Sequence, residues 1–197
     1  MSENKEEDKY FKQRELERRE AARRERELAA LRQTEREGIA EVLNTTEEIA
    51  EEALELGFSQ ETARVLPLIP LIQVAWVDGS VSTAEERAIL DLAVARGLEK
   101  GTPSFDFLTR LLAERPADLF FERTNRVIAE LVQADPDSWV KKTVPELCKE
   151  VADASGGFFG LGNRISKEEQ DLIDEIAELL DASSATVKDL GVFKGDE

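Results

Sequence analysis

Apolar residues recur at three- and four-residue spacing through most of the chain after residue 38, which is the spacing of amphipathic helices. No segment shows the sustained two-residue alternation of a half-buried strand. The predicted fold is therefore all-α, a compact bundle of about seven or eight helices. The predicted helices lie near residues 39–57, 60–66, 67–77, 83–97, 102–115, 117–134, 135–155 and 166–180.

Short polar, glycine and proline positions predict where these helices begin and end. Thr45 or Thr46 is expected to cap a new helix after a break at Asn44, and Ser59 to cap the next one. Pro67 and Pro70 do not fit inside a single helix, so a short helix is expected before them and a second one from either proline onward. That second helix is apolar nearly all round, which predicts a buried central position.

Residues 1–37 have a different pattern from the rest of the chain. Glu and Arg recur three and four apart, and such pairs stabilise a helix standing in water. Its apolar stripe is thin, consisting of Leu16, Leu28 and Leu31 with alanines between them. The chain is therefore expected to divide into a charged helical arm, 1–37, and an acidic helical domain, 38–197. The arm is either a solvated helix or a partner-binding or oligomerising element.

The charge of the chain is concentrated in the domain. The whole sequence has 26 basic and 43 acidic residues and no histidine, giving −17. Residues 1–37 hold 11 of each sign, so residues 38–197 hold 15 basic and 32 acidic residues, again −17. Such a body repels phosphate, so nucleic acid is not expected as a partner, whereas cations and basic proteins are. With no signal peptide and no apolar run of about 20 residues, the protein is expected to be cytoplasmic.

An acidic turn interrupts the apolar pattern at residues 78–85. Asp78-Gly79 is a turn signal, and Ser82 with Glu85 has the spacing of a capping box. The same carboxylates suit a divalent cation such as Ca²⁺, Mg²⁺ or Mn²⁺, although the spacing does not match an EF-hand loop. Capping and cation binding both remain open interpretations. The absence of histidine excludes His-based catalysis and His-ligated zinc, and the single cysteine, Cys148, is expected to be buried and inert.

A weak internal repeat relates 74–90 to 151–173. Val81-Ser82 aligns with Ile165-Ser166 and Glu85 with Glu169, while Ser155 stands in the place of Asp78. This predicts two pseudo-repeated helix–turn–helix units in one body.

The stretch "VAWVDGSVSTAEERAIL" resembles the signature of TerB-like, tellurite-resistance-associated proteins, and the resemblance extends over about residues 60–182. It implies an all-α domain with a divalent-cation site at Asp78 and Glu85, and more weakly at Glu169. Ser155 departs from that pattern and argues against two symmetric sites.

The loop "SGGFFGLGN" at 155–163 has two interpretations. Phe158, Phe159 and Leu161 either fold back onto the core or form an exposed apolar contact for a protein partner or a membrane surface.

Together these features predict a non-enzymatic binding or scaffold module. The resemblance to TerB-like proteins implies that it serves a cytoplasmic stress response of the tellurite or oxyanion-resistance type. No cofactor is required beyond a divalent cation at the acidic turn. The alternatives are a carboxylate-based, metal-dependent hydrolase and a structural adaptor that oligomerises through the N-terminal helix.

Overall fold

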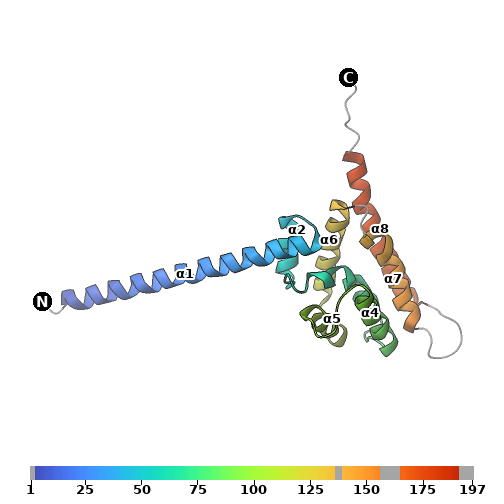
Figure 1. Ribbon diagram of the computed structural model, residues 1–197, viewed down its shortest axis with the longest axis horizontal. Coiled ribbons are helices and arrows are strands. Elements are labelled where there is room, and N and C mark those ends of the chain that lie inside the picture. The colour runs from blue at the N-terminus through green and yellow to red at the C-terminus, as the bar shows by residue number, and fades with distance from the viewer. Residues whose placement is uncertain (1–2, 136–138, 156–164, 191–197) are drawn as a thin grey trace, which may run out of the picture.

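A computed structural model describes residues 3–135, 139–155 and 165–190 of the chain. Within these ranges the fold is all-α and has no strand, as the sequence predicts (Figure 1). Eight α-helices and one 3₁₀ helix follow in the order α1 (Glu3–Leu43), α2 (Glu47–Glu55), η1 (Ala63–Leu68), α3 (Ile69–Ala75), α4 (Thr83–Ala95), α5 (Pro103–Ala113), α6 (Asp118–Ala134), α7 (Trp139–Ser155) and α8 (Lys167–Leu190).

Helix α1 is 41 residues long and projects from the body as one continuous rod (Figure 1). At 1.5 Å per residue it is about 60 Å long. It runs without a break past residue 37 to Leu43, and its buried positions begin at Gly38 and Ile39. Gly38 lies within the helix at a point where α1 passes close to Gln60. A Cβ at this position would lie 2.5 Å from the side-chain Cδ of Gln60. A glycine that signals a boundary in the sequence is thus a close-contact position.

The ends of the helices after α1 follow the predicted turn chemistry. Asn44 adopts φ 51° between α1 and α2, and Thr46 caps α2 by accepting a hydrogen bond from the Ile49 amide. Gly57 and Gly97, both with positive φ, follow α2 and α4. The expected cap at Ser59 is wrong, because the residue before η1 is Thr62.

Helix α3 lies in the centre of the body. Six of its seven residues are buried, which confirms the prediction from its all-round apolar pattern. Pro67 lies within η1 and Pro70 lies in the first turn of α3. The backbone N–H that proline lacks has no acceptor within the helix at such a position, so proline is tolerated there. Trp76, directly after α3, is half-buried, and its indole Nε1–H donates to the Leu111 carbonyl oxygen at 3.0 Å.

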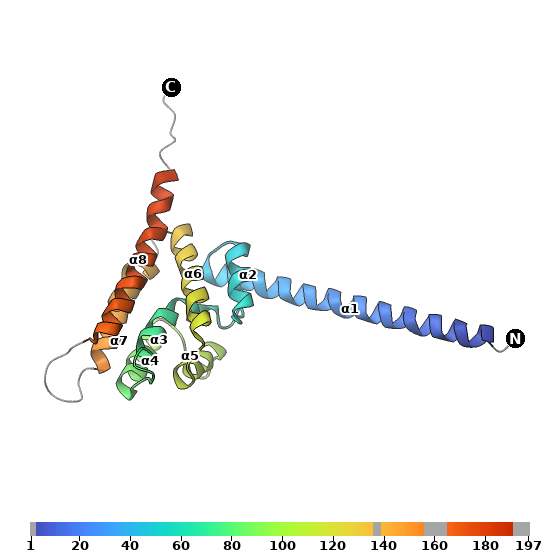
Figure 2. The ribbon, with the colours of Figure 1, turned by 180° about the vertical axis from the view of Figure 1, so that it is seen from behind.

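The two predicted helix–turn–helix units are the pairs α3–α4 and α7–α8. Helix α7 packs against α3, α4 and α8, so the two units form one core rather than separate lobes. Figure 2 shows α7 and α8 side by side on the far side of the body from α1. Pro145 lies within α7, which continues on both sides of it.

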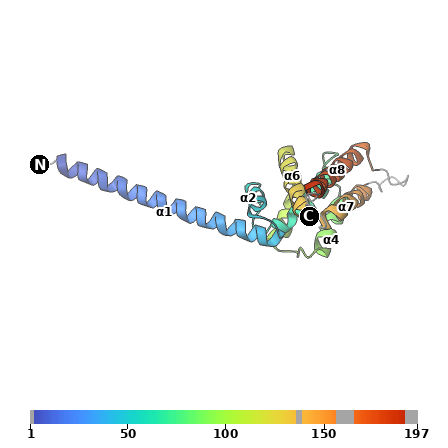
Figure 3. The same ribbon diagram turned by 90° about the horizontal axis from the view of Figure 1, so that it is seen from above.

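Ion pairs join the inner end of α1 to α2, and a further ion pair joins α2 to α6. Arg36 pairs with Glu47 at 2.8 Å, and Arg32 pairs with Glu51 at 2.5 Å. Glu55 at the end of α2 then pairs with Arg123 of α6 at 3.1 Å. Figure 3 shows α1 passing under α2 before it enters the body. None of the helices in the described part of the chain is both long and apolar enough to cross a membrane.

Candidate functional site

The acidic turn between α3 and α4 is a compact loop. Helix α3 ends at Ala75, and the Gly79 amide donates to the Trp76 carbonyl oxygen at 2.9 Å. Gly79 has φ 85°, a left-handed conformation that glycine adopts without strain. Asp78 is exposed at the tip of this turn. The interruption in the apolar pattern is therefore a turn between two packed helices.

Glu85 is a buried capping residue. The Ser82 amide donates to Glu85 Oε2 at 2.7 Å, and the Glu85 amide donates to Ser82 Oγ at 3.2 Å. These reciprocal bonds form the predicted capping box and satisfy two amides that the first turn of α4 leaves without helical partners. Only 4% of Glu85 is exposed. Glutamate side chains are rarely buried to this extent, and the sequence pattern did not indicate the burial of Glu85.

The second repeat unit builds the same arrangement at the start of α8. The Ser166 amide donates to Glu169 Oε2 at 2.6 Å, and the Glu169 amide donates to Ser166 Oγ at 3.1 Å. Glu169 is also buried, with 3% exposure. The alignment of Ser82 and Glu85 with Ser166 and Glu169 thus corresponds to one local structure formed twice.

The two capping boxes interact electrostatically. The pKa of Glu85 is raised above its ordinary value, first because burial penalises the carboxylate and further because of the charges of Glu169 and Asp78. The hydrogen bonds with Ser82 oppose this shift but do not cancel it. The repeat units therefore meet with their capping acids close enough for one charge to act on another. All three residues predicted as cation ligands lie in this one neighbourhood.

The capping role uses oxygens that a cation would otherwise take. Among the described residues, no group of three or more His, Cys, Asp or Glu side chains is placed to hold a metal ion. A cavity of about 740 Å³ lies elsewhere, between the end of α1, η1 and the C-terminal end of α6, and its lining includes Arg64, Arg96 and Leu131. The cation site at Asp78, Glu85 and Glu169 stays a prediction, and capping is the role for which hydrogen bonds are present.

Cys148 is fully buried in α7, as expected. Burial raises the pKa of its thiol to about 12, so the nucleophilic thiolate is scarce at neutral pH. Phe158, Phe159 and Leu161, the predicted partner contact, lie outside the described residues.

One charged surface was not singled out from the sequence. Glu168, Asp171, Glu175 and Glu178 are exposed on α8, and their three- and four-residue spacing places them on one face. We call these four residues the α8 acidic face. None of the four pairs with a cation in the part of the chain that the structure describes. The signal was present in the sequence, where seven acids and one lysine occupy residues 167–181, but the apolar positions of this helix dominated its interpretation.

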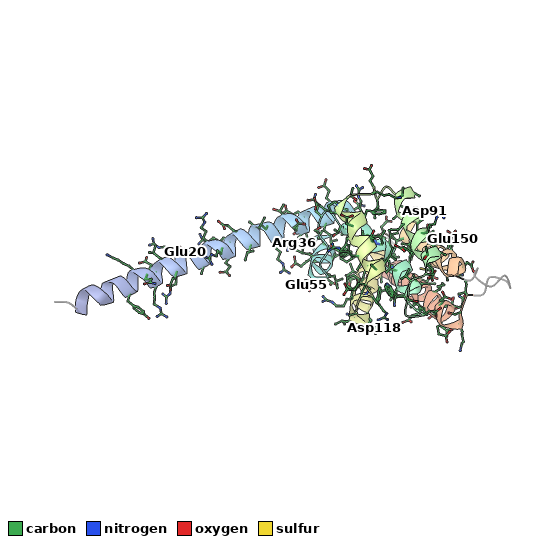
Figure 4. All side chains as sticks on the ribbon, turned by 90° about the horizontal axis from the view of Figure 1, so that it is seen from below. Glu20, Arg36, Glu55, Asp91, Asp118 and Glu150 are labelled. Carbon is green, nitrogen blue, oxygen red and sulfur yellow. The ribbon has the colours of Figure 1, made fainter. Side chains whose placement is uncertain are left out.

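The arm differs from this face. Its side chains project from all sides of α1 along its length (Figure 4). Acids and arginines alternate along α1, and Arg19–Glu15 and Arg23–Glu27 pair at 2.6 and 2.8 Å. Three acids of the arm, Glu15, Glu20 and Glu27, thus pair with arginines of their own helix, whereas no described cation pairs with the α8 acidic face. Comparisons of the chain with protein-family models, with curated proteins and with solved structures give no match.

Proposed function

We propose that the chain is a non-enzymatic helical binding module whose α8 acidic face binds a basic segment of a protein partner. The observation that carries the proposal is the set of four exposed carboxylates on one side of α8, none of which pairs with a cation among the described residues. Like charges three and four residues apart destabilise a helix by a few tenths of a kcal/mol per pair. A cationic partner relieves that repulsion, so the face gains more from such a partner than from water.

The chemistry of the partner follows from the charge distribution. The body carries −17, which attracts cationic partners over long range and speeds their encounter. The three- and four-residue spacing of the acids matches lysines or arginines on one face of a helix. A basic amphipathic helix is therefore the partner that fits best.

The biological setting is proposed from the resemblance to TerB-like proteins, which favours a stress response of the tellurite or oxyanion-resistance type. That part rests on analogy between sequences, not on the geometry of a site. A divalent cation at Asp78, Glu85 and Glu169 is the second candidate activity. It is supported by the repulsion among these acids, which a bound cation would relieve.

The test is calorimetric titration with a synthetic helical peptide that carries lysines at three- and four-residue spacing. Replacing the α8 acidic face with Gln and Asn should weaken binding roughly tenfold or more, since each exposed ion pair contributes up to about 1 kcal/mol. The matched control makes the same change in net charge at four scattered, exposed glutamates: Glu99→Gln, Glu114→Gln, Glu122→Gln and Glu146→Gln. Equal losses in both variants would reduce the binding to general attraction and refute a specific face.

A further inference from the structure

The face that α1 turns toward the body continues along the arm after the body ends. Inside the body, Gly38 and Ile39 are buried and Val42 packs against the core. The same alternation of three- and four-residue steps continues outward from Gly38. We call the residues on this continuation the arm stripe: Ala21, Arg24, Leu28, Leu31 and Glu35.

The arm stripe is apolar where it leaves the body. Leu28 and Leu31 are 67% and 64% exposed, more than any other large hydrophobic residue that the structure describes. Helix propensity does not explain leucines at these positions, because alanine or glutamate would stabilise a solvated helix about equally well. Their exposure on the continuation of a buried face points to an interaction surface.

A groove lies beside these two leucines, between the arm and the body. It encloses about 670 Å³ and is lined by Leu28, Leu31, Arg32, Glu35, Leu54, Glu55 and Arg123. Three leucines form its apolar part, and its charged residues include two arginines and two glutamates. An amphipathic helix with leucines and with charges of both signs suits such a surface.

Charge complementarity selects a second copy of the arm as the occupant. The arm is neutral overall, with 11 residues of each sign, so it is not repelled by a body of charge −17. In an antiparallel pair, positions face one another when their numbers have a constant sum. The register that places Leu28 against Leu31 of a second copy also places Arg24 against Glu35 of that copy, because both sums are 59.

We propose that two copies of this chain associate through antiparallel arms, each burying its Leu28 and Leu31 against the other. Residues 24–31 of each arm then lie along the groove, which Leu54, Glu55 and Arg123 complete on the other copy. A parallel pair would place Arg24 of one copy against Arg24 of the other. It would also bring the two bodies, each of charge −17, together at the same end of the pair. The antiparallel pair replaces the contact between arginines with one between Arg24 and Glu35, and it sets the two bodies on opposite sides of the contact, with about 20 Å of helix between their bases at Arg36.

Sedimentation velocity over a concentration series tests the association. The wild type should form dimers, and the Leu28→Glu, Leu31→Glu double variant should dissociate with a dissociation constant raised roughly 30-fold or more, as for hot-spot residues. Ala29→Glu is the matched control, because Ala29 is exposed on the same turn but lies about 100° and 160° around the helix from the two leucines. A wild type that stays monomeric at every concentration, or a control as disruptive as the double variant, overturns the proposal.

Charge exchange tests the register. Arg24→Glu and Glu35→Arg should each weaken self-association, because each places like charges opposite one another. A mixture of the two variants should restore dimers as heterodimers. Glu35 Oε2 also accepts from the Gln60 amide at 2.8 Å, so circular dichroism must first show that Glu35→Arg remains folded. A well-folded mixture that forms no heterodimer refutes this register.

Energy transfer between copies tests the direction of the pair. Donor-labelled Arg18→Cys is mixed with acceptor-labelled Glu41→Cys, and both positions are exposed on α1. The antiparallel pair brings position 18 of one copy beside position 41 of the other, because 18 and 41 also sum to 59, whereas a parallel pair leaves these two positions about 35 Å apart. The buried Cys148 does not compete for the label. Near-complete transfer supports the antiparallel pair, and the weaker transfer of a separation of about 35 Å, in a sample that sediments as a dimer, overturns it. The α8 acidic face takes no part, so this test and the peptide titration can fail independently.

Discussion

Removing the carboxylate of Glu85 separates its two physical effects, capping and charge repulsion. Glu85→Ala leaves the Ser82 amide without its 2.7 Å acceptor. Losing a cap of this kind costs about 1 kcal/mol. In a chain of this size that lowers Tm by roughly 2–4 °C. Glu85→Gln keeps an amide oxygen that can accept the same bond while it removes the buried charge, and Gln is the other residue that capping boxes use.

At pH 7 the Gln variant should be at least as stable as the wild type, because the raised pKa means that folding penalises the Glu85 carboxylate. The unfolded chain titrates near the ordinary value of 4.5, and the folded chain titrates higher. Between these two pKa values the folded state holds more protons, so the contribution of Glu85 to stability falls as pH rises through this interval. The advantage of Glu85→Gln should therefore be absent below pH 4.5 and complete above the folded pKa.

The assay is thermal and urea unfolding of the wild type and both variants across this pH interval. A double-mutant cycle with Glu169→Gln measures the coupling between the two capping boxes. The benefit of Glu85→Gln should shrink when Glu169 is already neutral, because part of the repulsion has then been removed. A Gln variant as unstable as the Ala variant, with no dependence on pH, would refute this account of Glu85.

Three further predictions follow from the body. Cys148 should resist thiol reagents in the native protein and react after unfolding in urea, and rapid native labelling would contradict its burial and its pKa of about 12. Gly38→Ala should stabilise the protein by about 0.5–1 kcal/mol in a Gln60→Ala background, as measured by urea unfolding. In the wild type the gain should be smaller or absent, because the new Cβ meets the Gln60 side chain. Equal effects in the two backgrounds would contradict the close contact. Titration of EDTA-stripped protein with Ca²⁺, Mg²⁺ and Mn²⁺ should raise Tm in a saturable manner that Asp78→Asn abolishes if the acidic turn binds a cation, and no shift in any titration would leave the turn with capping alone.

The local features of the fold were readable from the sequence because their causes are local. Helix periodicity, the Thr46 cap and the Ser82–Glu85 capping box each depend on residues within a few positions of one another. The role of Gly38 was not readable, because it depends on Gln60, which the chain brings close only after folding.

The candidate site divides in the same way. Capping by Glu85 and Glu169 follows from the Ser-x-x-Glu spacing, but their burial and electrostatic contact arise only when α3–α4 packs on α7–α8. The α8 acidic face could have been found from spacing alone. The absence of an ion pair to these acids within the described ranges could not have been predicted, because it depends on which cations the fold places nearby.

The unbroken passage of α1 through Gly38 makes the arm a lever. From Arg36, where α1 is tied to α2, to Glu3 at its tip is about 50 Å of helix. A tilt of about 10° at the base would therefore carry the tip about 9 Å. A hinge at Gly38 would have dissipated such a motion, whereas a continuous helix transmits it. Any load applied far out on the arm is consequently felt as a torque on the ion pairs that join α1 to α2.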